Sequence, residues 1–146
     1  MDLKRISPEE TKELLDADDG FVYLDVRDVA EFAAGHPPGA KNVPVFERGP
    51  MGMAPNSSFV EVVEANFTKE TKIITGCLRG PRSMRAAQML IAAGFSEVID
   101  MRGGLDGEMD PMGGIGYPGW QRRGLPVSSD PKPEDTYSAL KQTSDR

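Results

Sequence analysis

Cysteine and histidine are nearly absent from this chain, since each occurs once among its 146 residues. A single cysteine permits no internal disulfide bond and no zinc site built from cysteines. One histidine adds too few ligands for a metal cluster, and no aspartates fall in the spacing of a calcium-binding loop. The composition therefore predicts no metal site, and we expect no cofactor.

Positive charge and long apolar runs are also scarce. Lys and Arg number 17 against 23 Asp and Glu, and the resulting net charge of −6 argues against a general nucleic-acid binder. No apolar run approaches the roughly 20 residues that span a bilayer, and the N-terminus has no signal-peptide core. We therefore expect neither a nucleic-acid nor a membrane partner. The expected location is cytoplasmic, or an organellar stroma or matrix if a transit peptide has been removed.

Short apolar segments alternate with amphipathic ones over most of the chain. The apolar, β-branched segments predict strands at 21–26, 42–45, 72–76 and 97–101. Capping residues and apolar periodicity predict helices after Ser7, after Asp28, within 59–67 and within 82–94. This alternation predicts an α/β fold with a central, mostly parallel β-sheet and helices on both faces. A ligand site is expected where the strands end.

Three segments are predicted without regular structure because Gly, Pro and polar residues dominate them. They are a loop at 47–56, a surface loop at 103–119 and a polar, mobile tail at 128–146. A last helical turn is predicted at 120–124.

Cys77 directly follows one predicted strand and opens the segment Cys77-Leu78-Arg79-Gly80-Pro81-Arg82-Ser83. Backbone N–H groups in such a turn converge into an anion cradle, and the following helix N-terminus adds partial positive charge. Gly80 permits unusual backbone angles and Pro81 stiffens the turn. Positive charge is added by Arg79, Arg82 and Arg85. These features favour a reactive thiolate over the alternative, a buried and inert cysteine.

Several motifs then resemble the rhodanese-like domain, over about residues 5–127. They are LDVRDVAEFAAGHPPGAKNVPV, the loop CLRGPRS followed by an Ala-rich helix, GFSEVIDMRGGL, and Trp120 with Gly124-Leu125-Pro126. The resemblance implies the rhodanese-like fold for a domain at 1–127. Residues 106–119 depart from the family as an inserted loop, where a lid, a partner surface and a decorated loop remain open. Pro37 also departs, where isoleucine or valine is more usual.

The resemblance implies an activity as well, that of a thiosulfate sulfurtransferase. The Cys77 thiolate would take the outer sulfur of thiosulfate or a related donor and pass it, as a persulfide, to cyanide or a thiol acceptor. The expected partners are thus a small anionic sulfur donor and such an acceptor, which can include a sulfur-accepting protein. The anion-binding residues implied are Leu78, Arg79, Gly80, Pro81, Arg82 and Ser83.

Neighbouring residues have competing interpretations. Arg82 either binds the anion or fixes the loop, whereas a substrate role is favoured for Arg79. Asp25 and Arg27 are expected to support the loop from behind, although Arg27 has Glu31 as an alternative partner at helical spacing. Trp120 is expected in the core. His36 is expected to fix a loop rather than act as a base.

Two rival functions remain. Cysteine phosphatases and arsenate reductases related to this fold place five residues between cysteine and arginine, whereas four separate Cys77 from Arg82. The second rival is a weakly catalytic module that carries sulfur to, or binds, one partner.

Overall fold

The structure is a computed structural model that describes residues 3–145. Within this range the principal sheet is parallel throughout, and its strand order is β1-β7-β6-β2-β3. The strands, in chain order, are β1 (Lys4–Ile6), β2 (Phe21–Asp25), β3 (Lys41–Asn42), β6 (Lys72–Gly76) and β7 (Glu97–Met101). The predicted α/β class with a mostly parallel central sheet is confirmed.

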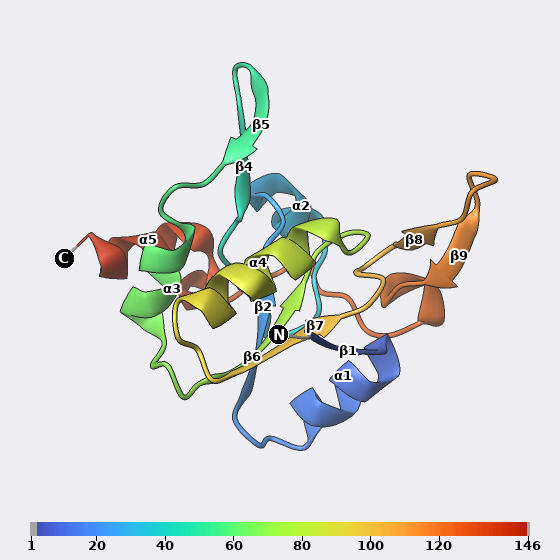
Figure 1. Cartoon of the computed structure of the whole chain (residues 1–146), viewed down its shortest axis with the longest axis horizontal. Coiled ribbons are helices and arrows are strands. Elements are labelled where there is room, and N and C mark those ends of the chain that lie inside the picture. Colours follow the sequence, from blue (N-terminus) through green and yellow to red (C-terminus); the bar gives the residue numbers. More distant parts are fainter. Residues whose placement is uncertain (1–2, 146) are drawn as a thin grey trace.

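Helices cover both faces of this sheet (Figure 1). They are α1 (Pro8–Asp16), α2 (Val29–Ala34), α3 (Phe59–Asn66), α4 (Pro81–Ala92), α5 (Tyr137–Ser144) and two short 3-10 helices, η1 (Gln121–Arg123) and η2 (Pro133–Asp135). The predicted capping box at Ser7 forms, and Asp28, predicted only as a cap, also forms one. Each side chain accepts the backbone N–H three residues on, from Glu10 and Glu31.

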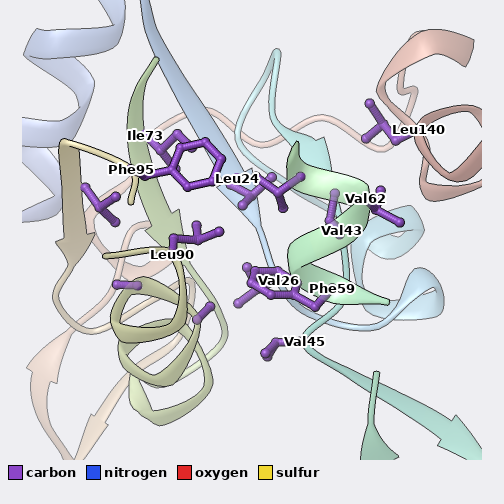
Figure 2. Packing of buried hydrophobic residues seen from close by; sticks show 14 of the residues in the cluster. Leu24, Val26, Val43, Val45, Phe59, Val62, Ile73, Leu90, Phe95 and Leu140 are labelled. Carbon is purple, nitrogen blue, oxygen red and sulfur yellow. The ribbon is translucent and has the colours of Figure 1, made fainter. Parts of the chain in front are cut away.

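Alternate residues of the central strands enter two hydrophobic clusters, one on each face. Leu24 and Ile73 lie on the face covered by α3, α4 and α5, in one hydrophobic cluster with Phe59, Leu90 and Leu140 (Figure 2). The neighbouring residues Tyr23 and Ile74 face the other way, in a cluster that includes Phe32, Met101 and Trp120. Trp120 is 1% exposed, as expected for a core residue.

The two segments predicted as loops are instead antiparallel hairpins that project from the body (Figure 1). The first pairs β4 (Phe46–Gly49) with β5 (Gly52–Pro55), and the second pairs β8 (Gly107–Met109) with β9 (Ile115–Pro118). Their strands are mostly exposed, so no apolar alternation marks them. The Gly and Pro residues that suggested a loop lie in and beside the turns. β1 was also missed because it has only three residues.

The segment expected to be a mobile tail differs most from the prediction. Residues 137–144 form α5, which packs on α3, and Tyr137 and Leu140 are 7% and 6% exposed. Asn56 Nδ2 donates to the Tyr137 hydroxyl at 3.0 Å, and Asn66 Nδ2 donates to the Leu140 carbonyl at 2.9 Å. Two buried apolar residues and two hydrogen bonds thus attach this helix to the core.

Candidate active site

Cys77 lies where β6 ends and is 1% exposed. The chain then turns through residues 78–80 into α4, whose N-cap is Gly80 with φ of +123°. Residues that carry a side chain rarely adopt this backbone angle, so the turn requires glycine at this position. Cys77 thus occupies the carboxyl end of a central parallel strand, as the sequence predicted for a ligand site.

Two backbone N–H groups point at the sulfur. The amide of Gly80 donates to Cys77 Sγ with N and S 3.1 Å apart, and that of Ser83 does so at 3.3 Å. The Ser83 hydroxyl lies 3.4 Å from Sγ and donates to the Gly80 carbonyl at 3.0 Å. Such converging N–H groups stabilise negative charge on the sulfur. The loop can therefore hold a thiolate or a small anion attached to it.

A second chain segment supports this loop from behind. Leu105 N–H donates to the Cys77 carbonyl and Asp106 N–H to the Leu78 carbonyl, both at 2.9 Å. A Cβ placed on Gly104 would lie 2.4 Å from the Cys77 carbonyl oxygen, a distance that real Cβ atoms do not tolerate. Gly104 is therefore the residue that lets the two segments approach. The sequence analysis recognised this glycine only as part of a motif.

The three arginines near Cys77 all have partners other than the sulfur. Arg82 forms a two-pronged ion pair with Glu31, with N···O distances of 2.7 and 3.0 Å. Arg79 reaches Asp106 at 2.7 Å and the Gly107 carbonyl at 3.3 Å, while Arg85 lies over the Phe46 ring. Leu78 packs in the core, and Pro81 occupies the first turn of α4. The predicted residues are thus gathered around Cys77, but the arginines form its rim.

Asp25 and Arg27 form a buried ion pair at the end of β2. Arg27 Nη2 lies 2.7 Å from Asp25 Oδ2 and donates to the Gly35 carbonyl at 2.6 Å. Arg27 therefore pairs with Asp25, and the alternative pair with Glu31 does not form. His36 stacks on Phe32 with ring centres 4.0 Å apart, as suits a residue that fixes a loop.

Asp100 is the site residue that the sequence analysis missed. It is fully buried at the end of β7, accepts the Thr75 hydroxyl at 3.1 Å and accepts Arg5 Nε at 3.1 Å. Burial raises the pKa of this carboxyl, and the hydrogen bonds from Arg5 and Thr75 oppose the rise. An acidic residue at the end of a buried strand was the available signal. The partner Arg5 lies in β1, which was not predicted.

A cavity of about 410 Å³ opens beside the Cys77 loop and is lined by Glu31, Phe46, Arg48, Met53 and Arg82. It offers room for a small donor or acceptor. A larger cavity of about 500 Å³ lies against α2, and none of its lining residues belongs to the loop. Among residues 3–145, no three His, Cys, Asp or Glu side chains gather in a way that could hold a metal ion. In the same range, no helix has the length and apolar character needed to cross a membrane.

Comparison with known proteins shows which family and which solved structures this chain resembles. A family model for the rhodanese-like domain matches residues 7–108. Thiosulfate sulfurtransferase 16, chloroplastic, from Arabidopsis thaliana is 41% identical over 75% of this chain and 82% of its own length. Rhodanese-like domain-containing protein 15, chloroplastic, from the same plant is 40% identical over 74% of this chain and 53% of its own length. The crystal structure of Rv0390 from M. tuberculosis aligns with a TM-score of 0.73 at 26% identity, over 89% of this chain and all of that one.

Proposed function

Since the chain belongs to the family of rhodanese-like domains, we propose that it is a thiosulfate sulfurtransferase that carries sulfur as a persulfide on Cys77. Relatives named thiosulfate sulfurtransferase support an enzyme of the rhodanese family. We propose in addition the nucleophile, the sulfur donor and the sulfur acceptor. This proposal rests on the geometry around one sulfur atom.

The observation that carries the proposal is the pair of N–H groups on Cys77 Sγ, from Gly80 at 3.1 Å and Ser83 at 3.3 Å. Hydrogen bonds to a charged acceptor favour the charged form, and the thiolate is the nucleophilic form of cysteine. These N–H groups belong to a turn backed by residues 104–106, so little reorganisation is needed when charge develops.

In the first half-reaction the Cys77 thiolate attacks the outer sulfur of thiosulfate. A new S–S bond forms, the original S–S bond breaks, and sulfite leaves with the bonding electron pair. The persulfide then carries the negative charge on its terminal sulfur. We propose that the loop from Leu78 to Ser83 holds this charge through its backbone, with Asp25 and Arg27 fixing the neighbouring strand end.

In the second half-reaction an acceptor nucleophile attacks the terminal sulfur. Cyanide leaves as thiocyanate, or a thiolate leaves as a new persulfide, and the Cys77 thiolate is restored. Because the chain has no second cysteine, an internal disulfide cannot form, and transfer must go to another molecule. We propose a small thiol, cyanide or a sulfur-accepting protein as acceptor, in the cytoplasm or in an organellar stroma or matrix.

The phosphatase and arsenate reductase alternative is less well supported. A phosphoryl or arsenate group brings several charged oxygens, and Arg82 would have to leave Glu31 to meet them. Four residues between Cys77 and Arg82 also make a smaller loop than that class uses. A partner-specific sulfur carrier differs from the proposed enzyme only in its acceptor.

Intact mass spectrometry tests the proposal. After incubation with thiosulfate the protein should gain one sulfur atom, and cyanide should remove it while thiocyanate appears. Cys77→Ser should fold normally and gain no sulfur. A wild-type protein that never gains sulfur but hydrolyses an aryl phosphate or reduces arsenate would overturn the assignment.

A further inference from the structure

Arg5 connects three parts of the chain behind the Cys77 loop. Its Nε donates to Asp100 Oδ2 at 3.1 Å, and its Nη2 lies 3.5 Å from Glu108 Oε2. Asp100 is the penultimate residue of β7, whereas Glu108 belongs to the projecting β8–β9 hairpin. The Arg5 side chain is 28% exposed and comes from the edge strand β1. The hairpin and the sheet edge therefore share one guanidinium.

The third part is Gly80 in the loop itself. A Cβ placed on Gly80 would lie 3.4 Å from Arg5 Nη2, so the guanidinium packs directly against this residue. The Gly80 peptide has φ of +123° and its N–H donates to Cys77 Sγ. Glycine turns readily to other angles. The Ser83 hydroxyl and the Met84 N–H hold the Gly80 carbonyl, and the Arg5 guanidinium is a further neighbour that restricts the peptide whose N–H is aimed at the sulfur.

Asp100 anchors the arrangement to the sheet. The carboxylate is fully buried, one oxygen accepts the Thr75 hydroxyl, and the other accepts Arg5. A planar guanidinium can meet two carboxylates at once, which a lysine ammonium does with less directional control. The carboxylates of Asp100 and Glu108 therefore fix the Arg5 guanidinium, and its Nη2 lies against Gly80.

We propose that Arg5 is a positioning residue for the Cys77 nucleophile: held by Asp100 and Glu108, it fixes the Gly80 peptide whose N–H contacts Sγ. The proposal rests on the proposed function only for its turnover readout. Part of the inserted segment 106–119 then contributes to the site, because Glu108 in this segment forms the second ion pair with Arg5.

The test measures alkylation of Cys77 by iodoacetamide across a pH series, together with thiosulfate:cyanide kinetics. Arg5→Met should slow alkylation at neutral pH and raise its pH midpoint. It should lower kcat by about 10- to 100-fold, the usual effect of a small misplacement at a reacting centre. KM for thiosulfate should stay unchanged because Arg5 lies behind the loop. Other charged or titratable groups around the thiol stay in place, namely Asp100, Glu31, Arg82, Asp25, Arg27 and Tyr23.

Arg102→Met is the matched control. Arg102 binds the same Glu108 at 3.0 Å and stacks on Tyr117, so its loss disturbs the same hairpin without touching Gly80. We expect this variant to keep both the alkylation profile and kcat. A purely structural Arg5 would instead lower thermal stability and leave the alkylation midpoint in place.

Arg5→Lys keeps the charge but not the planar fork, and we expect an intermediate kcat and midpoint. This variant also decides the matter if Arg5→Met does not fold. Wild-type alkylation behaviour in Arg5→Met, or in Arg5→Lys when only that variant folds, overturns the proposal. Because iodoacetamide needs no sulfur donor, the outcome is readable even if the wild-type protein fails to form a persulfide, which would count against the proposed function alone.

Discussion

We expect Gly104→Ala to lower kcat strongly while most of the protein stays folded, because the free energy of unfolding falls by only a few kcal/mol. Gly104 has φ of +62°, and a Cβ there would lie 2.4 Å from the Cys77 carbonyl oxygen and 2.5 Å from the Leu78 carbonyl carbon. These atoms are backbone, so no flexible side chain can move aside. The loop and residues 103–106 must separate by roughly an ångström to reach ordinary contact distances near 3.5 Å.

The magnitude follows from what that separation disturbs. Two hydrogen bonds join the segments, from Leu105 N–H and Asp106 N–H, and each contributes about 0.5–1.5 kcal/mol. The left-handed backbone adds about 1–2 kcal/mol for alanine. We therefore expect a loss of about 2–5 kcal/mol in unfolding free energy. An ångström of displacement at Cys77 should lower kcat about 100-fold.

Gly113→Ala is the control for backbone strain. Gly113 also has a positive φ, +87°, but a Cβ there would meet nothing within 4 Å. This variant should lose about 1–2 kcal/mol and keep its turnover. Urea unfolding and thiosulfate:cyanide kinetics on both variants separate the two effects. If Gly104→Ala turns over like Gly113→Ala, the close approach of residues 103–106 does not control the loop.

Three further outcomes are expected. Leu140→Ala should cost about 2–5 kcal/mol in urea unfolding because the side chain is buried between α5 and α3, and a loss near zero would mean that α5 does not dock. Burial alone would raise the pKa of Glu31, but the hydrogen bonds and charge of Arg82, the Asp28 N–H and the charge of Arg27 together lower that pKa below its ordinary value. An acid whose pKa is lowered by folding stabilises the fold at every pH above its ordinary pKa. Glu31→Gln should therefore be less stable than wild type at neutral pH. This difference in stability should vanish as the pH falls through the pKa of Glu31 in the folded protein. A pH-independent difference would exclude the charge as its cause. Arg79→Ala should raise KM for thiosulfate without slowing alkylation of Cys77, and the reverse result would show that Arg79 tunes the thiol.

The sheet was predictable because its central strands are buried on both faces. Residues 21–25 and 72–76 are short apolar runs, each ended by a polar or small residue, and such runs suit parallel strands between helix layers. The capping boxes were readable for a similar reason, since all their atoms lie within four residues. Local sequence determines both features.

The hairpins and α5 were not predictable in the same way. β4 and β5 are held by pairing of Phe46 with Pro55 and Arg48 with Met53, and this register leaves no periodic apolar pattern. α5 depends on two buried side chains and on Asn56 and Asn66, which lie about 80 residues earlier. Polar composition therefore suggested a free tail, although the helix is docked.

The candidate site shows the same division. Cys77 and its loop were identifiable because a strand, a cysteine, a glycine and a helix follow one another directly. The partners of the arginines were not identifiable from the sequence, because Glu31 lies 51 residues from Arg82 and Asp100 lies 95 residues from Arg5. In the sequence, Arg79, Arg82 and Arg85 add positive charge near Cys77. In the folded chain each of Arg79, Arg82 and Arg5 faces a carboxylate.

This pairing bears on which anion the loop suits. A cysteine phosphatase must hold a tetrahedral group with several charged oxygens on its sulfur, and a free guanidinium meets those oxygens. In the proposed sulfur transfer the oxygens of thiosulfate leave with sulfite, and a single sulfur atom stays on Cys77. Here the groups aimed at the sulfur are the peptide N–H groups of Gly80 and Ser83, within the described part of the chain. Two such donors match the single charge of a thiolate or a persulfide. The arginines around Cys77 are paired and the chain has a net charge of −6, so its long-range field does not attract an anionic donor. Binding of the donor then depends on short-range contacts at the loop.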